Sequence, residues 1–75
     1  MEDGKVKELA DEADIIVNGY AFFKNSNKIK VINLNQTEKV TILDMNGIVL
    51  TTTMDAIEVD IVLDCFNRNR KYIFL

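Results

Sequence analysis

The fold is decided by the hairpin signal in residues 40–53, VTILDMNGIVLTTT. Two apolar, β-branched runs flank Asn46-Gly47, a dipeptide that tolerates the positive φ angles of a type I′ turn. A two-residue loop would give the cross-strand pairs Met45–Ile48, Leu43–Leu50 and Thr41–Thr52. Both faces of this hairpin carry apolar residues, so the pattern does not show which face meets solvent.

Two more extended segments precede the hairpin. Residues 20–23 are rich in aromatic side chains, and residues 29–34 are rich in β-branched ones. Polar residues at 24–28 and 35–38 separate these runs and are typical of turns. Residues 19–53 therefore predict four strands of an antiparallel sheet.

A helix is predicted at the start of the chain. Apolar residues recur at i, i+3, i+4, i+7, i+10 and i+11 between residues 6 and 17, which is the spacing of one helical face. Asn18-Gly19 supplies the left-handed residues that end helices. Carboxylates near the C-terminal end oppose the helix dipole, so an alternative ends the helix near Ala13 and leaves residues 15–17 extended.

A second helix is predicted after Asp55. Asp55 and Glu58 have the spacing of a capping box, and apolar residues follow at helical spacing. These apolar residues are Ile57, Ile61, Val62, Cys65 and Phe66. A buried strand over residues 58–63 is the competing interpretation, because that stretch is β-branched. Residues 70–75 predict a short final strand, which at a sheet edge would be a template for another chain.

The predicted fold class is α+β. We expect an antiparallel sheet of four to five strands with two helices on one face, in the order α-β-β-β-β-α-β. The 75 residues are too few for two cores, so residues 1–75 are predicted to form a single domain. A hydrophobic content of 48% is high enough for a folded interior.

Most of the parts of a catalytic site are missing from the sequence. It contains no histidine, and its three scattered glycines form no phosphate loop. Cys65 is the one cysteine, and its apolar helical neighbours predict a buried thiol. Asp60 and Asp64 lie one helical turn apart and are candidates for a shared divalent ion, but acidic helix faces are usually solvated. We therefore expect no enzyme activity, no cofactor and no metal.

Charge is segregated along the chain, whose formal net charge is −3. Acidic residues concentrate in the predicted helices, and cations concentrate in the strands and near the end of the chain. Solvated mixed-charge faces are the plain explanation, but acidic helices also attract a protein partner with a basic surface. The predicted partner-binding residues of these helices and of the final strand are Glu8, Asp11, Glu12, Asp14, Asp60, Asp64, Tyr72 and Ile73.

Three alternatives stay open. In size, acidity and lack of catalytic residues the chain is similar to small inhibitors of phages and mobile elements, including anti-CRISPR proteins, which would dock on a basic nucleic-acid-binding groove. The second alternative is a platform for single-stranded nucleic acid, although three lysines in an acidic protein are weak evidence of a basic nucleic-acid-binding surface. Its residues would be Lys24, Lys28, Lys30, Tyr20, Phe22 and Phe23. A homodimer through paired edge strands is the third.

The expected location is the cytoplasm, in a bacterial cell or a phage-infected host. A single cysteine provides no disulfide framework of the kind that small secreted domains use. The sequence also shows no signal peptide and no apolar run of membrane-spanning length. We therefore expect no membrane partner.

Overall fold

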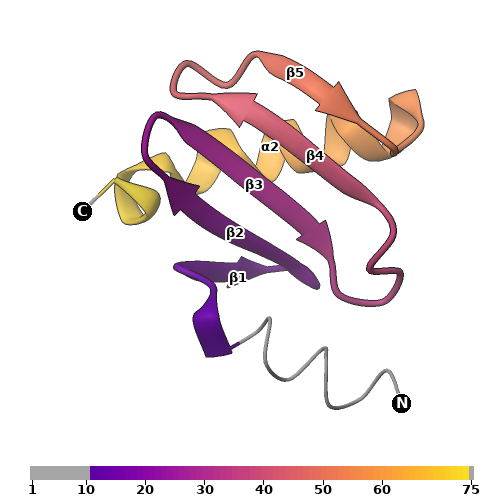
Figure 1. The fold of residues 1–75 in the computed structure, drawn as a ribbon, viewed down its shortest axis with the longest axis horizontal. Helices are drawn as coiled ribbons and strands as arrows, with labels where there is room; N and C mark the ends of the chain where they lie inside the picture. Colours follow the sequence, from indigo (N-terminus) through magenta and orange to yellow (C-terminus); the bar gives the residue numbers. More distant parts are fainter. Residues whose placement is uncertain (1–10, 75) are drawn as a thin grey trace.

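The computed structural model describes residues 11–74, which form an antiparallel sheet of five strands and a long helix across one of its faces (Figure 1). The elements are β1 (Ile15–Val17), β2 (Tyr20–Asn25), β3 (Lys28–Asn33), β4 (Val40–Asp44), β5 (Val49–Thr52) and α2 (Ala56–Ile73). Each strand pairs with the next one along the chain, so β1 and β5 are the two edges. The predicted α+β class and antiparallel sheet are confirmed.

The predicted order with a helix first and two helices on one face is not supported. Residues 15–17 form strand β1, which pairs in register with residues 20–22. Asn18 and Gly19 have φ angles of 53° and 81° and form the turn of the β1–β2 hairpin, not a helix cap. Pairing of β-branched residues with a neighbouring strand overrides the helical spacing here. Residues 11–12 are helical, and residues 6–10 of that predicted helix lie outside the described residues.

The predicted final strand over residues 70–75 is wrong. Helix α2 continues through Ile73, and Phe74 is its C-cap. Ile73 is only 3% exposed and lies seven residues after the buried Phe66, so it extends the buried stripe of the helix. The Phe74 ring packs edge-to-face on the Phe66 ring, with 6.0 Å between the centroids. These contacts outweigh the local preference of the segment for extended structure.

The core lies between α2 and the sheet face that it covers. Large side chains from three strands and the helix are fully buried there, and they include Phe22, Ile29, Val31, Leu43, Val62 and Phe66. Asp55 is the N-cap of α2, and its carboxylate accepts the Glu58 backbone N–H at 2.8 Å, as predicted. Ile57 and Ile61 do not enter this core. They are 74% and 46% exposed, because the helix turns a different stripe of apolar residues toward the sheet.

The β4–β5 hairpin forms as predicted, but its turn is wider than two residues. The observed pairs are Thr41–Thr52, Ile42–Thr51 and Leu43–Val49. Leu50 is therefore the extra residue of a β-bulge. Gly47 has a φ of 87°, and a Cβ added to it would lie 2.9 Å from Cε2 of Phe66. The turn at Gly47 is therefore in close contact with the buried Phe66 ring.

Gly47→Ala is expected to destabilise the fold more than Gly19→Ala. Both changes place alanine at positive φ, which costs about 1–2 kcal/mol. At Gly47 the new Cβ also meets the Phe66 ring at 2.9 Å, whereas at Gly19 the nearest atom is Nδ2 of Asn35 at 3.5 Å. Urea unfolding would measure both free energies of unfolding. Equal losses in the two variants would contradict the close contact of the turn with Phe66.

Candidate interaction surface

Strand β5 is an exposed edge of the sheet. It pairs with β4 on one side, and its residues Leu50, Thr51 and Thr52 are exposed. Natural edge strands usually carry charges or proline that discourage pairing with another chain, but residues 49–52 contain neither. The bulge at Leu50 and the length of only four residues are the protective features of β5. Ile48 is 61% exposed and Leu50 is 50% exposed, so apolar area accompanies the unpaired backbone.

Charges of opposite sign lie at the two ends of β5. The turn before β5 contacts the last turns of α2, where Nη2 of Arg70 donates to the carbonyl of Met45 at 3.3 Å and Lys71 follows. The chain after β5 leads directly into α2, so its N-cap Asp55 lies near the end of the strand. Helix α2 then crosses behind the sheet toward β2, where Nζ of Lys24 lies over the Phe74 ring at the end of the helix (Figure 1).

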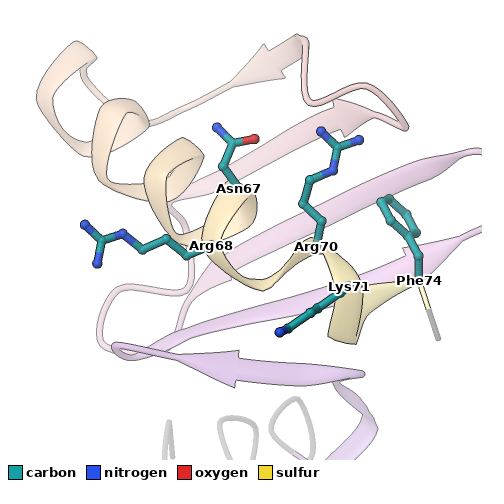
Figure 2. A pocket seen from close by; sticks show the side chains of 5 residues that line it. All are labelled: Asn67, Arg68, Arg70, Lys71 and Phe74. Atoms are coloured by element: carbon teal, nitrogen blue, oxygen red, sulfur yellow. The ribbon is translucent and has the colours of Figure 1, made fainter.

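The basic end of α2 is hollowed beside Phe74 (Figure 2). The hollow has a volume of about 580 Å³ and is lined by Asn67, Arg68, Arg70, Lys71 and Phe74. The guanidinium carbon of Arg70 lies 5.9 Å from the Phe74 ring centroid, and Nζ of Lys24 lies 5.7 Å from it. The cationic groups of Arg70 and Lys24 therefore both lie within cation–π distance of the Phe74 ring. Arg68, Arg70 and Lys71 make the lining of this hollow cationic, so its charge suits an anionic group.

The structure does not gather the predicted acidic residues into one surface. Glu8 lies outside the described residues, whereas Asp11, Glu12, Asp14, Asp60 and Asp64 are exposed. Asp14 accepts the backbone N–H of Lys24 and so lies at the basic end of the molecule. Asp60 lies in the first half of α2, near the other end. Asp64 forms an exposed ion pair with Arg68, with 3.0 Å between Oδ2 and Nε.

The two residues predicted for the terminal edge strand lie in α2 instead. Tyr72 is exposed, and Nζ of Lys71 lies 5.1 Å from its ring centroid. Ile73 is buried in the core and is not available to a partner. Sequence reasoning placed the open edge at the wrong strand. No local signal in residues 49–52 marks them as an edge, because the edges of a sheet follow from the order of its strands.

The aromatic residues of the nucleic-acid platform are not all on one face. Tyr20 and Phe22 point toward α2 and are buried in the core, so they cannot stack on bases. Phe23 alternates to the opposite face, where it pairs across the strands with Lys30. Two of the three aromatics of this alternative are therefore structural.

A closed polar cluster fixes the first turns of α2 on the sheet. The Glu58 carboxylate accepts hydrogen bonds from the Tyr20 hydroxyl at 2.9 Å and from Nδ2 of Asn33 at 2.7 Å. Burial first, and then the hydrogen bond to Glu58, raise the pKa of Tyr20 from its ordinary value to about 12. Cys65 is buried beside this cluster, as predicted, and accepts a contact from Nδ2 of Asn18 at 3.4 Å. The partners of all these groups are internal, so the cluster serves the fold.

Two further features of the described residues bear on function. Across residues 11–74, no three His, Cys, Asp or Glu side chains are grouped in a way that would hold a metal ion. Within the same part of the chain, no helix has the length and apolar character needed to cross a membrane.

Residues 11–74 define a mostly β member of the α+β class, in which a five-stranded antiparallel meander is covered on one face by a C-terminal helix. The chain belongs to a family of unknown function, DUF7723, whose model matches residues 3–73. No curated protein and no solved structure matches it.

Tyr20 is expected to make the protein lose stability at alkaline pH. Its pKa in the folded state, about 12, lies above its ordinary value of 10.0, so the unfolded chain releases this proton first. The stability contributed by Tyr20 is therefore complete below pH 10 and is lost as the pH rises from 10 to about 12. Urea unfolding at a series of alkaline pH values would measure the loss.

The matched control for this prediction is Tyr72→Phe, which removes a hydroxyl from an exposed ring. Tyr20→Phe should flatten the alkaline loss of stability, and it should cost roughly 1–2 kcal/mol at neutral pH through the lost hydrogen bond to Glu58. Tyr72→Phe should leave the alkaline loss unchanged. Identical pH profiles for the two variants would contradict the role of Tyr20.

Proposed function

We propose that this chain is a small, non-enzymatic protein-interaction module that binds a protein partner by extending its sheet at β5. The observation that supports this most directly is the uncharged edge strand with exposed Ile48 and Leu50. An added strand gains main-chain hydrogen bonds along the edge, and the neighbouring side chains provide specificity. The other edge, β1, has only three residues and offers a shorter template.

The charged helix supports the same function by guiding the encounter. Arg70 donates a hydrogen bond to the turn before β5, and Asp55 caps α2 just after the end of β5. Charges at the rim of an interface change the association rate and the orientation of docking more than the final affinity. A partner strand at β5 would therefore meet a cation at one end and a carboxylate at the other.

Leu50→Lys should abolish binding of the partner. The new ammonium group would lie beside the incoming strand and would have to lose water there, which natural edge strands use to prevent pairing. The test is a crosslinking pull-down of the tagged full chain from its native host, followed by affinity measurement with the purified partner. We expect at least about a tenfold loss of affinity, which corresponds to 1.4 kcal/mol.

The control is Ile57→Lys, which makes the same change at a residue that is 74% exposed and belongs to α2, not to β5. This variant should bind the partner as the unchanged chain does. Circular dichroism would verify that both variants fold. A partner that binds Leu50→Lys and Ile57→Lys equally well would overturn the proposed use of β5.

A further inference from the structure

We infer that the hollow at the end of α2 binds a small ligand that carries several linked phosphate groups, such as a polyphosphate or a nucleoside triphosphate. Its lining consists of Asn67, Arg68, Arg70, Lys71 and Phe74 (Figure 2). The hollow has a volume of about 580 Å³, within the range of roughly 300–1,000 Å³ that is common for small-molecule sites. This site belongs to α2 and not to β5, so the inference does not depend on the proposed function.

Positive charge accumulates around this hollow without a matching number of carboxylates. Residues 65–74 contain three cations and no acidic residue, although the whole chain has a net charge of −3. Within residues 11–74, the ion pair of Arg68 with Asp64 is the only one that these three cations form. Like charges that lie close together repel one another, and a bound anion removes that repulsion. The sequence of this segment therefore favours an anionic ligand.

The helix dipole explains only part of this charge. Cations in the last turn of a helix complement the partial negative charge of its C-terminal end, and Arg70 and Lys71 lie in that turn. Arg68 precedes the last turn, and its charge and the hollow beside it are not required by the dipole. A ligand accounts for all three cations together.

Each of the three cations has an internal contact that leaves further N–H groups for a ligand. Arg68 donates from Nε to Asp64 at 3.2 Å, which leaves both of its terminal amino groups. Arg70 donates from Nη2 to a backbone carbonyl at 3.3 Å and has other donors. Nζ of Lys71 lies 5.1 Å from the Tyr72 ring centroid. Side chains that are already held lose less conformational entropy when a ligand binds.

The three cations are spread around the hollow and do not meet at one point. Arg68, Arg70 and Lys71 leave the end of the helix in three different directions (Figure 2). A single phosphate group cannot contact all of them, whereas linked phosphates have charged oxygens along their whole length. Guanidinium groups bind phosphate oxygens in pairs, and an ammonium group adds a point charge. The directions of these side chains therefore favour a ligand with several phosphates.

Phe74 gives the hollow an apolar wall and brings a fourth cation close to it. The ring of Phe74 packs edge-to-face on Phe66, and Nζ of Lys24, from β2, lies 5.7 Å from its centroid. Asn67 lies seven residues before Phe74, which is about two helical turns, so both project from the same side of α2. An apolar wall beside a few polar groups is the usual composition of a small-molecule site.

The first test is the binding of tripolyphosphate to the full chain, measured by isothermal titration calorimetry at constant ionic strength. We expect saturable binding of one ligand per chain. Inorganic phosphate should bind at least about tenfold more weakly, because it reaches fewer of the cations. Absence of saturable tripolyphosphate binding would overturn the inference, and equally tight binding of inorganic phosphate would contradict a ligand with several phosphates.

ATP in the same titration identifies the source of the phosphates. Tighter binding of ATP than of tripolyphosphate assigns a contact to the nucleoside, whereas equal or weaker binding assigns the ligand to the phosphate chain alone. Binding of a single-stranded oligonucleotide without binding of tripolyphosphate or ATP would overturn the small ligand.

The second test removes two of the cations. Arg68→Gln combined with Lys71→Gln should weaken tripolyphosphate binding at least about tenfold, because charge-assisted hydrogen bonds are lost. Both residues are exposed, so the double variant should keep the fold, which circular dichroism would verify. The matched control combines Lys28→Gln with Lys30→Gln, two exposed lysines of β3, and makes the same change in net charge.

The control variant should bind tripolyphosphate as the unchanged chain does. Equal losses of affinity in the two double variants would overturn the inference, since net charge and not the hollow would then determine binding. Leu50→Lys should also keep the affinity for tripolyphosphate, because Leu50 does not line the hollow. The outcome of this test is therefore separate from that of the proposed strand addition at β5.

Discussion

The packing of Phe66 is the interaction on which the position of α2 relative to the sheet depends. Its ring is fully buried between α2 and the sheet, it meets the turn at Gly47, and Phe74 packs against it edge-to-face. The guanidinium of Arg70 lies 5.2 Å from the same ring centroid. The Phe66 ring fixes the last turns of α2 against the β4–β5 hairpin, because a closely packed interior leaves neither element room to shift. The start of β5 consequently lies beside the basic end of the helix.

The polar contacts of Glu58 hold the other end of α2. A carboxylate that accepts two hydrogen bonds from β2 and β3 fixes both the position and the rotation of the first turns of the helix. With both ends held, the stripe containing Val62 faces the sheet, while Ile57, Asp60 and Asp64 face solvent. The charge pattern on the surface is therefore a consequence of how the core is packed.

The edge strand β5 carries no charge, whereas Arg70 lies at the turn before it and Asp55 lies just after it. In the proposed function, backbone pairing along β5 provides affinity, and these charges orient the partner.

The sequence by itself determined the α+β class, the strands from Tyr20 to Thr52 and the start of α2 at Asp55, because turn residues, β-branched runs and helix caps act over a few neighbours. It did not determine that residues 15–17 pair as a strand, or that Tyr72 and Ile73 continue the helix. Those segments have ambiguous local preferences, and strand pairing with β2 and packing with Phe66 against the sheet decide them. The open edge at β5 was likewise decided by tertiary structure, since an edge exists only once the order of the strands is set.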